Sequence, residues 1–226
     1  MKKTCTNFLV VLAAAVGLCG FTFPAYAQAD AGLVSGFLNQ AKSAGDSQLG
    51  GIATELTGKI HSLGAAIGAN DAIGANDAIG ANDAIGANDA IGANDAIKSR
   101  LDSTLKALTG GEDSAALTSA FGLVKSAKLT PEQLGLAKQV GNLASAYVVQ
   151  KNFAALAGQQ GDVATIVSSL RSGNLKATVP PLKNVASNAK LTDTQKQLIT
   201  TVADKYAPGF SKAAGALDSL KKLPGF

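Results

Sequence analysis

The chain has little of the chemistry on which most enzymes depend. Its 226 residues include two cysteines, one histidine and no tryptophan. Both cysteines, Cys5 and Cys19, precede residue 28, so the rest of the chain has no thiol for a disulfide, a nucleophile or a metal site. A single histidine, His61, cannot build a typical zinc site without several carboxylates. We also find no phosphate-binding glycine loop, HExxH motif or Gly-x-Ser-x-Gly elbow, so the sequence predicts a protein that is not an enzyme and has no cofactor.

The N-terminus has the pattern of a secretory signal peptide. Lys2 and Lys3 precede an apolar run from Phe8 to Leu18, and Ala25-Tyr26-Ala27 fits the small-x-small cleavage rule. The apolar run is shorter than the roughly 20 residues of a spanning helix, and no later stretch is long and apolar enough to span a membrane. We expect cleavage after Ala27, export to the periplasm or outside the cell, and no stable membrane span. Loss of both lysines reduces the formal net charge of +4, and the remaining charge does not indicate nucleic-acid binding.

The periodicity of the apolar residues after the signal is helical, with no convincing alternation of period two. A clear stripe comprises Leu49, Ile52, Leu56, Ile60 and Leu63. Gly110-Gly111 and Ser172-Gly173 are expected to end helices, and Pro180-Pro181 to open a short one. The predicted fold is an all-α bundle of short amphipathic helices, with an N-terminal helical segment at 28–66 and a helical domain at 98–226.

Two stretches of the helical domain are similar at a spacing of 62 residues, "SAKLTPEQLGLAKQV" from Ser126 and "NAKLTDTQKQLITTV" from Asn188. They indicate an internal duplication, with halves at about 114–173 and 174–226. In each copy a threonine, Thr130 or Thr192, is followed three residues later by a glutamine, Gln133 or Gln195. This is the pattern of a capping box, in which two orphan amide donors at a helix start are satisfied.

The motif Leu-Thr-x-x-Gln, present at Leu129-Thr130/Gln133 and at Leu191-Thr192/Gln195, resembles that of the periplasmic LTxxQ-motif family. That resemblance implies a helical stress-response protein, in some members a chaperone, which dimerises and holds unfolded clients on a concave face. The residues that carry it are few. The family is rich in Met, Gln, Arg and Lys, whereas this chain has no Met after Met1.

Five identical copies of Gly-Ala-Asn-Asp-Ala-Ile, the hexads, run from Gly68 to Ile97. Six residues of an α-helix turn through about 600°, so successive isoleucines would point in three directions and make no single apolar face. The segment 67–97 is therefore predicted to be a linker or a weak helix; a left-handed β-helix is a less favoured alternative, because five copies make fewer than two coils. Asn94 or Asp95 is expected to cap a helix that begins at Ala96.

The aspartates of the hexads are the only candidate metal ligands that the sequence offers. They recur as Asp71, Asp77, Asp83, Asp89 and Asp95, but they lack the nine-residue period of the calcium β-roll. The perfect identity of the five hexads instead indicates a recent duplication within the gene. The sequence thus predicts an exported protein that acts by binding or structure, with a chaperone-like protein and an enzyme using scattered carboxylates as alternatives. It leaves the protein partner and the oligomeric state open.

Overall fold

The structure is a computed structural model, and it describes residues 31–77, 84–126, 129–188 and 190–208. For residues 69–77 and 84–93 it describes the backbone alone. The predicted signal peptide at 1–27 and the last part of the predicted helical domain, 209–226, lie outside these ranges, as do most of the hexad side chains.

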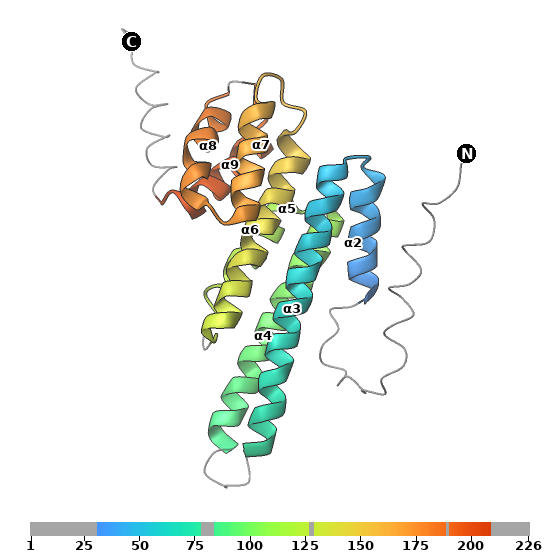
Figure 1. Cartoon of the computed structure of the whole chain (residues 1–226), viewed down its shortest axis with the longest axis vertical. Helices are drawn as coiled ribbons and strands as arrows, with labels where there is room; N and C mark the ends of the chain where they lie inside the picture. The colour runs from blue at the N-terminus through green and yellow to red at the C-terminus, as the bar shows by residue number, and fades with distance from the viewer. Residues whose placement is uncertain (1–30, 78–83, 127–128, 189, 209–226) are drawn as a thin grey trace, which may run out of the picture.

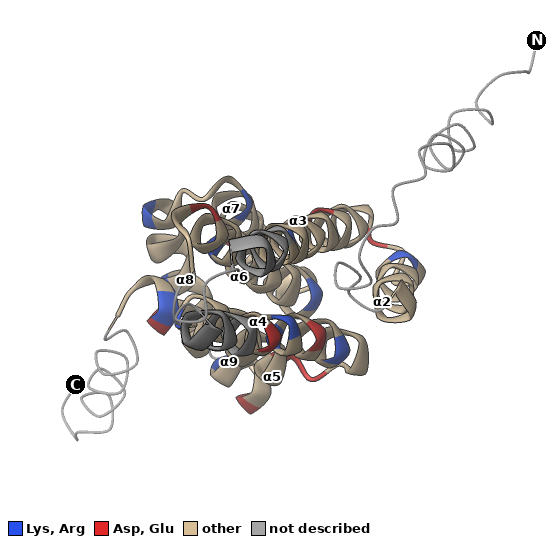
Figure 2. Ribbon diagram, turned by 90° about the horizontal axis from the view of Figure 1, so that it is seen from below, with Lys and Arg blue, Asp and Glu red and all other residues tan. Residues whose placement is uncertain are grey.

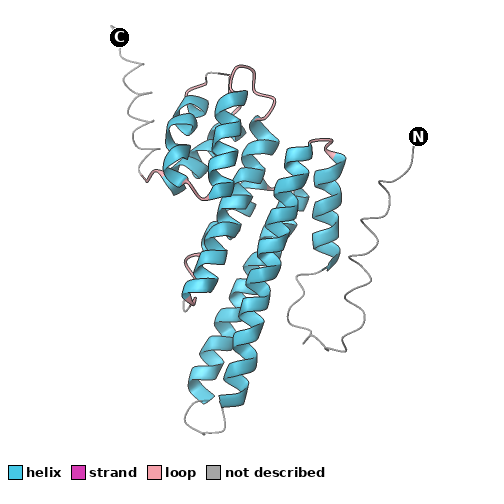
Figure 3. Cartoon of the chain, viewed as in Figure 1, coloured by secondary structure: helices cyan, strands magenta, loops and turns pink. Residues whose placement is uncertain are grey.

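The described residues form α-helices joined by short turns, without a strand (Figures 1 and 3). The prediction of an all-α bundle is therefore confirmed, but the helices are not all short, since those at Ser47–Asp77 and Ala84–Gly110 have 31 and 27 residues. In chain order the elements are α2 (Ala31–Ser43), α3 (Ser47–Asp77), α4 (Ala84–Gly110), α5 (Asp113–Leu123), α6 (Pro131–Phe153), α7 (Gln160–Ser172), the 3₁₀ helix η2 (Leu175–Thr178), α8 (Val179–Ala186) and α9 (Asp193–Tyr206).

Helix α6 is the centre of the fold. Every residue from Leu143 to Gln150 is buried, because α3, α5, α7 and α9 all pack against this helix. A helix that is covered on all sides is expected to be apolar all round, and Ala, Val and Leu predominate in this stretch. Its Tyr147 ring lies 4.8 Å from the ring of Phe37, which brings α2 into the same core.

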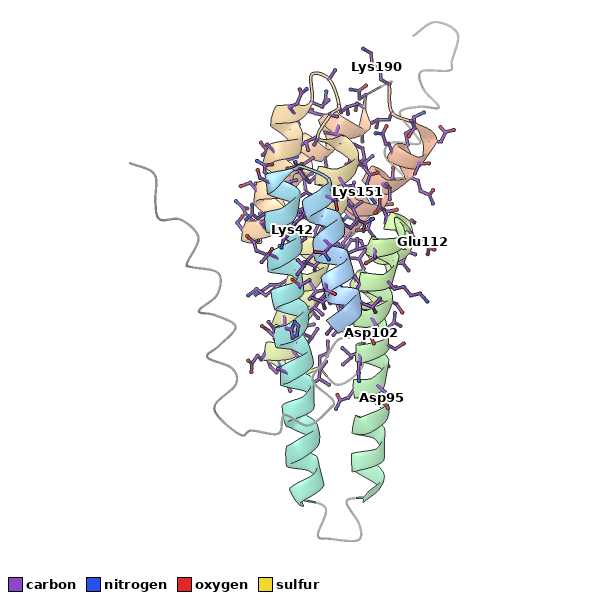
Figure 4. The ribbon with its side chains drawn as sticks, turned by 90° about the vertical axis from the view of Figure 1, so that its right-hand side faces the viewer. Lys42, Asp95, Asp102, Glu112, Lys151 and Lys190 are labelled. Atoms are coloured by element: carbon purple, nitrogen blue, oxygen red, sulfur yellow. The ribbon has the colours of Figure 1, made fainter. Side chains whose placement is uncertain are left out.

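Helices α3 and α4 are antiparallel neighbours that extend together beyond the end of α6 (Figures 1 and 4). We call this extension the arm. Its base is apolar, since Ile67 on α3 and Ile97 on α4 are both buried. The first hexad copies continue α3 as far as Asp77, and the later copies begin α4 at Ala84.

The prediction of a new helix at Ala96, capped by Asn94 or Asp95, is wrong. Helix α4 already begins at Ala84, twelve residues earlier. Extending a helix costs far less than nucleating one, so the packed segments on either side recruit the hexads despite their glycine content. The described hexad backbone is helical, and neither the linker nor the β-helix alternative applies to it.

The predicted helix ends agree with the structure. Gly111 and Gly173 follow α4 and α7 with φ of 77° and 75°, the left-handed conformation that a glycine adopts without steric cost. Pro180 lies in the first turn of α8, where its missing amide donor is not needed.

Candidate functional site

The two LTxxQ motifs start α6 and α9 with the same hydrogen bonds. The backbone amide of Gln133 donates to Thr130 Oγ1 at 3.2 Å, and the amide of Thr130 donates to Gln133 Oε1 at 3.0 Å. Thr192 and Gln195 repeat this capping box with the same two distances. The motifs therefore position two helix starts, which is the role that local chemistry predicts for them.

Each motif glutamine also makes a bond that the sequence pattern does not indicate. Gln133 Nε2 donates to the carbonyl oxygen of Ala66 on α3 at 3.1 Å, and Gln195 Nε2 donates to that of Asn152 on α6 at 2.8 Å. A glutamate would complete a capping box equally well, but it has no donor for these carbonyls. Both side chains are thus engaged within the fold.

Carboxylates at two other helix starts are bonded to the end of α6. Gln150 Nε2 donates to Asp46 Oδ2 at 2.7 Å, while Asp46 Oδ1 caps α3. The hydrogen bond from Gln150 is the main reason why the pKa of Asp46 is lowered, with the backbone amides of α3 assisting against partial burial. Asp113, the first residue of α5, accepts from Lys151 at 2.9 Å and from Asn152 at 2.8 Å. These acidic groups join helices.

A polar groove lies between α3, α6 and the end of α7. It is open on one side and has a volume of about 640 Å³. The two apolar residues in its wall are Leu143 and Leu170, and the remaining lining is polar or glycine. The described residues that line it are Glu55, Gly58, Lys59, Ser62, Gln139, Asn142, Leu143, Leu170, Arg171, Ser172 and Gly173.

An ion pair crosses the groove. The Arg171 guanidinium on α7 donates to both carboxylate oxygens of Glu55 on α3, and this bidentate contact raises the pKa of Arg171. Lys59 stands one helical turn from Glu55, so the groove carries two positive groups and one negative group.

The amide of Asn142 is fixed from behind the groove wall. Tyr206 on α9 donates its hydroxyl proton to Asn142 Oδ1 at 3.0 Å, and the hydroxyl also lies 3.2 Å from Ser145 Oγ. Burial raises the pKa of Tyr206 well above its ordinary value, so the group remains a neutral donor at physiological pH. The wall therefore presents an oriented amide beside Gln139 and the hydroxyls of Ser62 and Ser172.

Of the candidate metal ligands, Asp95 alone has a side chain that the structure describes, and it does not line this groove. Asp95 is exposed on α4, and the side chains of Asp71, Asp77, Asp83 and Asp89 are outside the described residues. Among the side chains that the structure describes, no three acidic, histidine or cysteine residues come together as a metal site would require. His61 is exposed on α3 and does not line the groove.

Sequence reasoning did not identify the groove residues. Glu55 and Arg171 are 116 positions apart, and neither stands in a recognisable motif. Only the fold of α3 against α7 brings them together, so no local signal could have marked them.

No known protein family, curated protein or solved structure matches this chain. In the described ranges, no helix combines the length and the apolar character needed to cross a bilayer. Figure 2 shows that most of the ribbon is neither acidic nor basic, in line with a charged fraction of 16%. A functional assignment therefore depends on the few places where charged and polar side chains gather.

Proposed function

We propose that the protein is exported and acts by binding, with the groove between α3, α6 and α7 as its ligand site. The observation that carries this proposal is the lining itself. Amide, hydroxyl and charged groups from three helices face one open space of about 640 Å³ around the Glu55–Arg171 pair. Such a set of donors and acceptors suits a small hydrophilic ligand.

The charges favour a ligand that carries an anionic group. Lys59 and Arg171 outnumber Glu55 in the lining, so a net positive charge remains in the groove after Arg171 pairs with Glu55. The lining residues that the structure describes include no aromatic ring on which a sugar face or a flat heterocycle could stack. A free amino acid, a dicarboxylate or a short peptide terminus fits these features best.

Two features favour binding over catalysis. Among the described residues, Glu55 is the one carboxylate in the lining, and it is paired with Arg171, so they supply no second acid for general acid–base work. Asp46 and Asp113 are bonded between helices at the far end of α6. The chaperone-like alternative has less support, because the motif glutamines Gln133 and Gln195 are engaged inside the fold.

The hexads fit this proposal as a recent insert that lengthened the arm. Each copy adds six residues, or about 9 Å of helix, at a distance from the groove. Copies added at the end of an arm do not disturb the packing of α6, which explains why an unselected expansion would be tolerated.

The test of the binding proposal is a titration followed by NMR. Protein purified from the cells that make it is titrated with free amino acids, dicarboxylates and short peptides, and mass spectrometry of the same material reports whether residues 1–27 are removed. We expect an acidic or zwitterionic ligand to perturb the groove resonances and Lys59→Gln to weaken its binding about tenfold. Lys42→Gln, on α2, is the matched control.

If no member of the panel perturbs the groove, the assignment of this site is wrong. A dimer that suppresses aggregation of an unfolded client, with no ligand in the groove, would favour the chaperone-like alternative.

A further inference from the structure

Four exposed cations from four distant parts of the chain meet at the end of α5. Lys205 on α9 lies over the ring of Phe121, with Nζ 5.1 Å from the ring centroid. The guanidinium of Arg100 on α4 lies against Gly122, where any side chain would collide with it. Lys125 lies in the turn just after α5, four positions after Phe121, and its positive charge acts on Lys205. Lys138 on α6 also acts electrostatically on Lys205, and it completes the basic cluster, defined as Arg100, Lys125, Lys138 and Lys205.

The charges of the basic cluster interact. The pKa of Lys205 is lowered, first by partial burial against Phe121 and Tyr206 and then by the positive charges of Lys125 and Lys138. Like charges that are held together destabilise a fold. The negative ends of the α5 and α9 dipoles offset part of this cost, since Lys125 and Lys205 lie at the C-terminal ends of these two helices.

The helix dipoles do not explain the whole arrangement. Arg100 lies in the interior of α4 and Lys138 in that of α6, away from the ends of their own helices. With 16% charged residues, the chain has few cations to gather in one place. A cluster assembled from positions 100, 125, 138 and 205 therefore indicates a surface that meets an anion.

We propose that the basic cluster binds the phosphate groups of anionic phospholipids at a membrane surface. The cluster is exposed on every member, so it lacks the buried donors that hold a free phosphate, whereas a lipid surface presents many phosphates at once. Each lysine or arginine near such a surface contributes about fivefold in partitioning. Phe121 lies beneath Lys205 and beside Tyr206, which leaves it poorly placed to stack on a nucleic-acid base.

None of the four residues of the basic cluster lines the groove, although Lys138 precedes the lining residue Gln139 on α6. The proposal does not depend on the identity of the groove ligand. The groove proposal and the membrane proposal can therefore fail independently. The groove variant Lys59→Gln is expected to bind vesicles as the unchanged protein does.

The experiment is co-sedimentation of the purified protein with vesicles that contain about one third phosphatidylglycerol in phosphatidylcholine, against pure phosphatidylcholine. The triple variant Lys125→Gln/Lys138→Gln/Lys205→Gln is compared with a triple variant of equal charge, Lys42→Gln/Lys183→Gln/Lys190→Gln. The control lysines are exposed on α2, on α8 and before α9, and Figure 4 shows Lys42 and Lys190 well separated. Circular dichroism verifies that both variants keep their helices.

We expect the cluster variant to lose about a hundredfold in partitioning to anionic vesicles, with the control variant close to the unchanged protein. Equal losses in both variants would show that net charge alone acts, and would overturn the proposal. It is also overturned if the unchanged protein does not distinguish the two vesicle types. Inorganic pyrophosphate and a short RNA, titrated without vesicles, identify a soluble phosphate or a nucleic acid as the partner if either perturbs the cluster more strongly than the vesicles do.

Discussion

The side-chain amide of Gln133 donates a 3.1 Å hydrogen bond to the backbone carbonyl of Ala66, which joins the start of α6 to the arm helix α3. Gln133 is only 2% exposed, and its other amide atom, Oε1, accepts from the cap residue Thr130. Both ends of one buried amide are thus satisfied, one within α6 and one between helices. Loss of either bond leaves a polar group away from water.

Gln133→Glu separates the two roles. The glutamate retains an oxygen for the capping box but loses the donor, and it places a negative charge against the Ala66 carbonyl. We expect a loss of about 2–3 kcal/mol in the free energy of unfolding, measured by urea denaturation at pH 7. Gln195→Glu is the matched variant at a less buried position, and it should cost about half as much. Equal costs at both positions would mean that burial is not the deciding factor.

The cap hydroxyls can be tested apart from the glutamines. Thr130→Ala and Thr192→Ala each remove the acceptor for one backbone amide, at N3 of α6 and of α9. Each should lower stability by about 1 kcal/mol, and serine at either position should restore most of it. Thermal unfolding of the single variants and of the serine variants provides the comparison. A serine variant as unstable as the alanine variant would exclude the cap as the cause.

Asp46 makes the stability dependent on pH. Its pKa is lowered, chiefly by Gln150, so the carboxylate stabilises the folded state above the ordinary pKa of an aspartate. That contribution is lost as the pH falls through the lowered pKa. The stability difference between the unchanged protein and Asp46→Asn should therefore shrink below about pH 4. In a Gln150→Ala background the same difference should depend less on pH, because the main cause of the shift is gone.

The space around Gly141 allows an alanine substitution that should stabilise the fold. A Cβ at this buried position on α6 would lie 3.5 Å from Phe121, an ordinary van der Waals contact. Alanine also loses less backbone entropy than glycine in a helix, so Gly141→Ala should raise stability by about 0.5–1 kcal/mol. Denaturation of the variant measures this gain. The neighbouring α5 position, Gly122, is the contrast, because a side chain there would have to displace Arg100.

The sequence predicted the features that depend only on residues close together in the chain. The capping boxes could be identified because a threonine and a glutamine three residues apart make them, and Gly173 could be identified because only its own φ matters. The bond from Gln133 to Ala66 spans 67 positions, and the pair of Glu55 with Arg171 spans 116. Such contacts depend on how helices pack, which no window of sequence contains. The error at Ala96 has the same origin, since packed neighbours outweighed a local cap signal.

The length of the arm can be changed to test whether the hexads lie outside the core. Deletion of one hexad, residues 80–85, should shorten the arm by about half of the 9 Å that six helical residues span, because the loss is shared between α3 and α4. The described core residues of α3 end at Ile67 and those of α4 begin at Ile97, outside the deleted copy, so the free energy of unfolding should change by less than about 1 kcal/mol. Small-angle scattering measures the length and urea denaturation the stability. A large loss of stability would show that the hexads belong to the core, and it would contradict their tolerance as a length-variable insert. The matched deletion of six residues within α6, 143–148, should by contrast prevent folding, since every residue it removes is buried.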